Sequence, residues 1–158
     1  MVAPVALSVE SLAACVAEAL AARPVALAYL FGSAAAGQMT PFSDVDIALV
    51  LDNNHAFRPD RLHLELEIED ELAGRCGLSQ ADVRVINAAP LLVRGEVLTH
   101  GRLLFARDEE TRIQFETRTR MDYFDFLPAA KLYQAAYFAN LRQRGLSGQR
   151  SKIAGYAR

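Results

Sequence analysis

A Gly-Ser pair followed by two closely spaced acids within an apolar stretch constrains this 158-residue chain more than any other feature. Gly32 and Ser33 are separated by ten residues from Asp44, and Asp46 follows after one valine. Because side chains alternate along an extended backbone, Asp44 and Asp46 should point to the same face of a strand. Two such carboxylates repel each other unless a cation lies between them, and Mg²⁺ bound to phosphate oxygens is the usual one.

The Gly-Ser turn predicts the other half of the same site. We expect Ser33 to open a short helix that ends near Gly37, with free backbone N–H groups facing an anion. Gly32 and Gly37 suit a tight turn around a phosphate because glycine accepts unusual backbone angles. A phosphate cradle opposite a metal-binding pair of acids indicates nucleotidyl transfer.

Asp82 is the candidate third carboxylate. It begins a predicted strand that should neighbour the strand of Asp44, which would bring three acids to one edge of a sheet. Two carboxylates would then hold two Mg²⁺ ions on the triphosphate. Asp82 would bind the metal on the acceptor side and take the proton of an attacking hydroxyl.

Hydrophobic periodicity predicts a small α/β unit with a helical C-terminal extension. Helices are expected at 8–22, 61–76 and 91–98, and strands at 25–31, 44–51, 81–87 and 102–106. Residues 61–68 also alternate as a strand would, but their helix-forming residues and the stop at Gly77 favour a helix. A long helix capped by Asp108 should end or kink at Pro128, and a second piece should end at Gly145.

We therefore expect a single domain over residues 1–158, with a core at 8–107, C-terminal helices at 108–145 and a basic tail at 146–158. The net charge of −2 and the pI of 5.9 argue against direct nucleic-acid binding. No apolar run is long enough to cross a membrane and no signal peptide is evident, which favours the cytoplasm. Cys15 and Cys76 lack both C-x-x-C spacing and a neighbouring His, so we expect small buried apolar side chains rather than catalytic thiols.

These residues resemble the minimal nucleotidyltransferases (MNT) of the DNA polymerase beta superfamily, which are paired with HEPN toxins. The likeness spans roughly residues 8–145 and rests on Gly32-Ser33, on Asp44-Val45-Asp46 and on the stretch from Asp82 to Pro90. It implies a small mixed-sheet fold and an antitoxin that uses ATP and Mg²⁺ to attach AMP to a tyrosine of its HEPN ribonuclease toxin. By position, it makes Asp44, Asp46 and Asp82 metal ligands, and Gly32, Ser33 and Gly37 nucleotide-binding residues.

One departure from the family pattern leaves alternatives open. Ala36 stands where the family often has Arg, which removes charge-assisted hydrogen bonds to the triphosphate. Either another residue such as Arg84 compensates, or the chain acts as a catalytically weak antitoxin that neutralises its toxin by direct binding. A small-molecule nucleotidyltransferase of the aminoglycoside-modifying type is a third possibility.

The C-terminal region leaves two further questions open. Its aromatic residues, among them Tyr133 and Tyr137, exceed what one packed face requires, so they either fill a core or form a partner surface. The basic residues near the end of the chain either form a solvated terminus or dock on an acidic partner.

Overall fold

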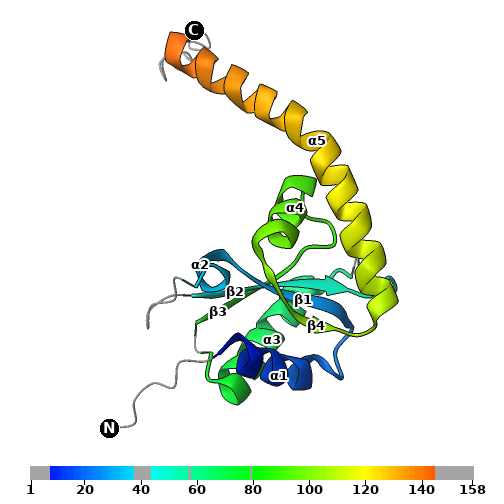
Figure 1. Ribbon diagram of the computed structural model, residues 1–158. Helices are drawn as coiled ribbons and strands as arrows, with labels where there is room; N and C mark the ends of the chain where they lie inside the picture. The colour runs from blue at the N-terminus through cyan, green and yellow to red at the C-terminus, as the bar shows by residue number, and fades with distance from the viewer. Residues whose placement is uncertain (1–7, 38–43, 57, 79, 145–158) are drawn as a thin grey trace, which may run out of the picture. The chain divides into compact units, whose positions relative to one another are not determined.

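The computed structural model describes residues 8–37, 44–56, 58–78 and 80–144 (Figure 1). Contacts divide the chain into two compact units, Met1–Asp122 and Tyr123–Arg158, and the sheet belongs to the first. The single domain expected from the sequence stays a prediction. The predicted basic tail and the helix end at Gly145 lie outside the described residues. In chain order, the elements are α1 (Val9–Leu20), β1 (Val25–Phe31), α2 (Gly32–Ala35), β2 (Val45–Leu51), α3 (Arg61–Cys76), β3 (Ala81–Val85), α4 (Leu91–His100), β4 (Arg102–Ala106) and α5 (Glu109–Arg144).

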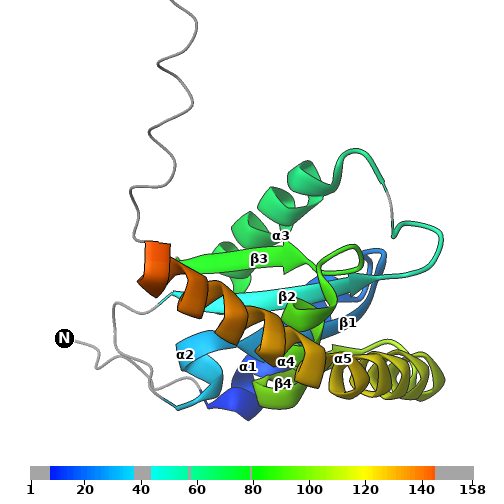
Figure 2. The same ribbon diagram turned by 90° about the horizontal axis from the view of Figure 1, so that it is seen from above.

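The four strands form one mixed sheet in the order β3-β2-β1-β4. Strand β1 is antiparallel to both β2 and β4, whereas β2 is parallel to β3. Figure 2 shows β3, β2 and β1 side by side. The predicted α/β fold with a mixed sheet and a C-terminal helix is therefore confirmed.

Helices cover both faces of the sheet. On the face of α1 and α3, side chains such as Ile47, Leu49 and Val83 are fully buried. On the other face, Ala48 and Val50 pack with Val97 of α4. The central strands β1 and β2 are thus apolar on both sides, which explains their nearly continuous hydrophobic sequence.

The first part of α5 is fixed to the sheet by a buried polar contact. The Tyr29 hydroxyl of β1 donates to Glu116 Oε1 at 3.0 Å, and Arg112 and Arg120 lie 3.4 and 3.2 Å from Glu116 Oε2. Burial, and then the charge of Glu116, raises the pKa of Tyr29, so the phenol stays protonated and keeps donating. Arg120 also donates to the Leu98 carbonyl of α4 at 3.1 Å.

Of the two outcomes expected at Pro128, an end of the helix is wrong, and a kink stays a prediction. Helix α5 runs from Glu109 to Arg144 with Pro128 inside it, so the predicted second helical piece is part of the same helix. A proline in a helix removes one N–H donor and frees the carbonyl four residues earlier. Phe124, which carries that carbonyl, and Pro128 are both exposed, so water can satisfy the freed group.

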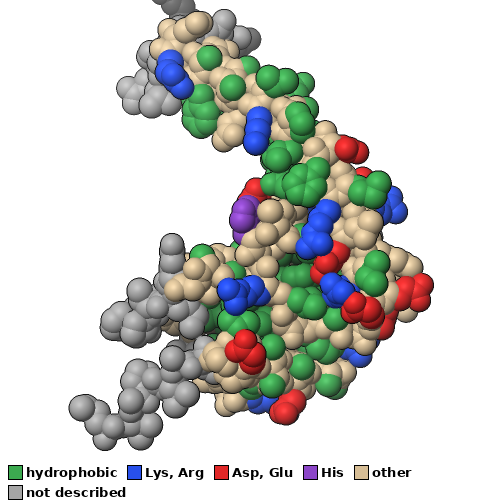
Figure 3. Space-filling model, viewed as in Figure 1, with side chains coloured by type: hydrophobic (Ala, Val, Ile, Leu, Met, Phe, Trp, Pro, Cys, Tyr) green, Lys and Arg blue, Asp and Glu red, His purple; other side chains and the backbone are tan. Residues whose placement is uncertain are grey.

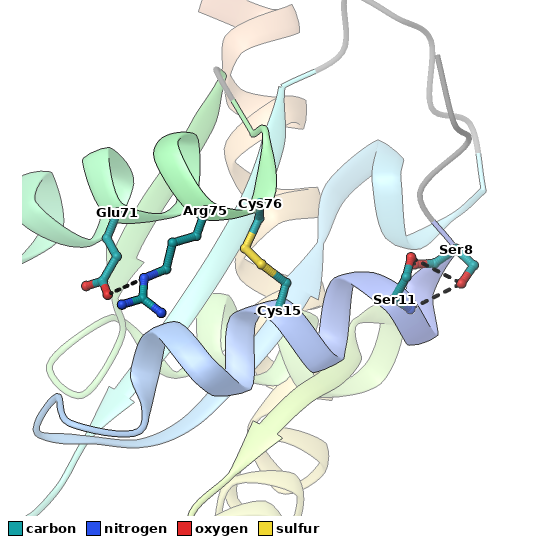
Figure 4. Close-up of a disulfide and its surroundings, with 6 residues drawn as sticks. All are labelled: Ser8, Ser11, Cys15, Glu71, Arg75 and Cys76. Carbon is teal, nitrogen blue, oxygen red and sulfur yellow. Dashed lines mark hydrogen bonds and ion pairs between the residues drawn. A yellow bond between two sulfur atoms is a disulfide. The ribbon is translucent and has the colours of Figure 1, made fainter. Parts of the chain in front are cut away.

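The expectation of two separate apolar cysteines is also wrong. Cys15 of α1 and Cys76 of α3 form a disulfide although they are 61 residues apart in sequence (Figure 4). Their Cα atoms are 5.9 Å apart because α1 and α3 pack side by side on one face of the sheet. The bond therefore joins α1 to α3, and Arg23, which follows α1 in the chain, adds ion pairs to Glu67 and Glu71 of α3.

We predict that this disulfide contributes substantially to stability. Closing a loop of 61 residues should contribute about 4 kcal/mol by restricting the unfolded chain. In urea unfolding, dithiothreitol should lower the midpoint of the wild type to near that of Cys15→Ser/Cys76→Ser, and it should leave the double variant unchanged. Two titratable thiols in the untreated protein, with no effect of dithiothreitol, would contradict the assignment.

Candidate active site

The parallel pairing of β2 and β3 aligns two acids. Asp46 of β2 lies directly opposite Asp82 of β3 in the strand register. Strands in a sheet are about 4.8 Å apart, and paired residues project to the same face. The adjacency inferred from the sequence for the Asp44 strand and the Asp82 strand is therefore confirmed.

Asp46 experiences both burial and the charges of the other two predicted acids. Desolvation raises the pKa of Asp46 most, and the charges of Asp82 and Asp44 raise it further. Asp44 is exposed and immediately precedes β2, whereas Asp46 and Asp82 are half-buried. The cluster therefore holds negative charge at one end of the sheet at some energetic cost, which a bound cation would offset.

Gly32 packs tightly against Asp46. Phe31 pairs with Asp46 at the end of β1, so the chain turns immediately beside this carboxylate. Gly32 has a φ of +69°, and a Cβ built there would lie 2.3 Å from Asp46 Oδ2. The backbone angle therefore favours glycine, and any Cβ at this position would force the Asp46 carboxylate to move.

The turn itself differs by one residue from the prediction. Helix α2 begins at Gly32 with Phe31 as its N-cap, so Ser33 lies inside the first turn and does not cap it. First-turn N–H groups have no acceptor within their own helix. Gly32 and Ser33 are exposed, and Gly37 follows α2 with a φ of +72°.

Asp82 is engaged by an arginine of its own strand. Arg84 Nη2 forms an ion pair with Asp82 Oδ1 at 3.0 Å. Asp82 Oδ1 is buried and accepts no hydrogen bond from the described residues. A guanidinium already lies beside this oxygen, so a metal ion would have to displace Arg84 to reach it.

The chemistry of the donor set fits Mg²⁺, which prefers carboxylate oxygens. Within the described ranges, no group of three or more His, Cys, Asp and Glu side chains already has the spacing of a metal site. The repulsion that Asp46 experiences from Asp82 and Asp44 nevertheless favours a cation at this end of the strands. Asp44, Asp46 and Asp82 are the residues that would hold it.

Two glutamates of α3 support the site and were not identified from the sequence. Glu69 accepts the N–H of Val83 at 2.9 Å, and the buried Glu65 accepts the N–H of Val85 at 2.8 Å. These N–H groups lie on the free edge of β3, which would otherwise remain unpaired. The acidic residues of the α3 sequence were visible, but their role as acceptors for β3 depends on how α3 packs against that strand.

A pocket of about 450 Å³ opens beside Gly32. Such a volume lies in the range of small-molecule sites. Its walls are mainly apolar and come from the end of β1, from Gly32 and from α4: Phe31, Gly32, Leu92, Val93, Glu96, Val97 and His100.

Aligned acids beside a glycine-led turn on a mixed sheet define a fold of the nucleotidyltransferase class. The family model described as "Polymerase beta, Nucleotidyltransferase" matches residues 16–110. The chain therefore belongs to the polymerase beta nucleotidyltransferase family. No curated protein matches it significantly.

Solved structures of similar fold come from toxin–antitoxin complexes. A toxin–antitoxin crystal structure with AMP-PNP has a chain with a TM-score of 0.62 and 18% identity, covering 82% of this chain and 98% of that one. A structure of the tri-AMPylated Shewanella oneidensis HEPN toxin in complex with MNT antitoxin has a chain with a TM-score of 0.59 and 18% identity, covering 84% of this chain and 99% of that one. A MntA-HepT structure gives 0.57 and 16% identity over 83% and 97%. At these identities the likeness concerns the fold.

We predict that Gly32→Ala abolishes most nucleotidyl transfer. The new Cβ would displace the Asp46 carboxylate, and misplacing a reacting group by about 1 Å costs roughly 100-fold in rate. Gly77→Ala is the matched control, because Gly77 also has a positive φ, of +67°, but no atom within 4 Å of the added Cβ. Both variants should lose about 1 kcal/mol of stability, and only Gly32→Ala should lose transfer from α-labelled ATP. Equal loss in both would contradict a specific role for the contact.

Proposed function

We propose that this chain is an antitoxin that transfers AMP from ATP to a tyrosine of a cognate HEPN ribonuclease toxin and thereby silences it. The register that places Asp46 opposite Asp82, beside the Gly32 turn, is the observation that carries the proposal. The similar folds in complexes of HEPN toxins, one of them tri-AMPylated, support the choice of acceptor.

In the proposed reaction, one of the three acids accepts a proton and the other two mainly bind metal. The phenol oxygen of the acceptor bonds to the α-phosphorus while the bond to the oxygen shared with the β-phosphate breaks, so pyrophosphate leaves. Asp82 takes the phenolic proton. Asp44 and Asp46 would be the principal ligands of Mg²⁺, and we expect two ions. The bound metal would neutralise charge on the phosphates.

The turn and the pocket would position ATP. Gly32 and Ser33 are exposed in the first turn of α2, where a phosphate could accept hydrogen bonds from their backbone N–H groups. The apolar pocket beside Gly32 is suited to a flat ring, such as the adenine base. Arg84, held beside Asp82, is the guanidinium available to replace the one that Ala36 lacks.

A second candidate function is an antitoxin that binds the same toxin with little or no catalysis. The ion pair between Arg84 and Asp82 and the alanine at position 36 both favour a weak enzyme that neutralises its toxin by binding.

Under either candidate the protein would act in the cytoplasm, where ATP is supplied. Among the described residues, no helix has the length and apolar character needed to span a bilayer.

We predict that wild-type protein with ATP and Mg²⁺ adds AMP to the purified toxin, as measured by intact mass spectrometry. Asp44→Asn/Asp46→Asn should reduce the transfer at least 1000-fold, because both metal-binding charges are lost. The exposed Asp70→Asn of α3 is the matched control and should leave the rate unchanged. An unmodified toxin after incubation with wild type would exclude the enzyme. Rescue of growth by the double variant would then establish the binding antitoxin.

A further inference from the structure

The C-terminal half of α5 is a long apolar helix surface. Between residues 126 and 141 the only charged side chain is Lys131. Four large apolar side chains of this segment are highly exposed: Leu132 at 72%, Tyr133 at 78%, Tyr137 at 63% and Phe138 at 47%. Figure 3 shows hydrophobic side chains gathered along this part of the helix. An exposed apolar surface of this extent is typical of an interaction site.

These four side chains surround the helix. At 100° per residue, neighbouring members around the axis are separated by at most about 120°. A helix that is apolar all round is normally buried on more than one side. Pairing with the same helix of a second copy would cover one stripe of each helix and leave the other side exposed. A groove between helices of a different protein can cover both sides.

The charge of this region specifies the rim of that groove. Residues 126–158 contain six Lys and Arg and no Asp or Glu, a net charge of +6, while residues 1–125 carry a net −8. Three of the basic residues, Lys131, Arg142 and Arg144, lie within α5 itself. A complementary partner surface is therefore apolar at its centre and acidic at its edge.

We propose that residues 126–144 insert into an apolar, acid-rimmed groove of the cognate toxin and form the main docking element for it. The proposal rests on the proposed function for the identity of the partner. The catalytic acids lie in the other unit of the chain, so docking and transfer are separable by mutation.

The test measures affinity of the full-length chain for the purified toxin by calorimetry. Leu132→Ala/Tyr133→Ala/Tyr137→Ala should weaken binding at least 100-fold, because exposed aromatic anchors commonly dominate interfaces. Leu62→Ala/Leu66→Ala on α3 is the matched control, with side chains 61% and 50% exposed, and should change affinity less than threefold. Circular dichroism should show unchanged helix content in both variants, since alanine favours helices.

The charge component has its own variant. Lys131→Glu/Arg142→Glu should weaken binding at least tenfold at 50 mM NaCl and much less at 500 mM, because salt screens the interaction. Unchanged affinity of the triple alanine variant would overturn the docking surface, while AMP transfer by the wild type would leave the proposed function standing. Loss of binding in that variant without any AMP transfer by the wild type would support the docking surface and contradict the proposed AMP transfer.

Two other occupants are outcomes that overturn the proposal. In sedimentation velocity, dimerisation of the chain alone that the triple variant abolishes would assign the surface to a second copy. Flotation with vesicles containing anionic phosphatidylserine, lost in the same variant, would assign it to a membrane. Failure of the wild type to bind the toxin at all would also overturn it.

Discussion

The site depends on holding like charges together at one end of a parallel strand pair. Asp46 and Asp82 are opposite each other because β2 and β3 run in the same direction with their registers matched. Their repulsion is tolerated because the neighbouring residues Ile47 and Val83 point to the other face and are fully buried in the core. Burial of aliphatic side chains contributes about 1.5–3 kcal/mol each, which is enough to hold the strands against the repulsion of two half-solvated acids.

The edge of β3 is secured by hydrogen bonds that its backbone donates to side chains of α3. Glu65 and Glu69 accept the N–H groups of Val85 and Val83, so the strand that carries Asp82 has a partner on each side. The disulfide between Cys15 and Cys76 ties the end of α3 to α1, six residues before Asp82. Helix α3 thus connects the stability of the fold to the position of the third acid. In a reducing cytoplasm this bond would be rare, so the redox state of the protein bears on how firmly Asp82 is held.

Local patterns in the sequence predicted most elements because they depend on near neighbours. The strands at 25–31 and 102–106 and the helix ending at Gly77 follow from apolar runs and breakers, and the structure confirms them. The sequence analysis inferred that the strands of Asp44 and Asp82 are neighbours, but the register that places Asp46 opposite Asp82 came only from the structure. The disulfide, the glutamates that cap β3 and the pairing of Arg84 with Asp82 were missed, since each depends on distant segments meeting in space. The helix does not end at Pro128, which was one of the two outcomes expected there, because a proline with exposed surroundings is compatible with a continuing helix.

The central claim is that Asp44, Asp46 and Asp82 together bind divalent metal beneath a nucleotide. Anomalous diffraction from crystals grown with Mn²⁺ and a non-hydrolysable ATP analogue tests it most directly. The account predicts manganese within roughly 2 to 2.5 Å of oxygens from Asp46 and its two neighbours, with Asp82 Oδ1 released from Arg84 and the phosphates against the Gly32 turn. Nucleotide bound elsewhere, or a saturated crystal with no anomalous peak at these carboxylates, would contradict it.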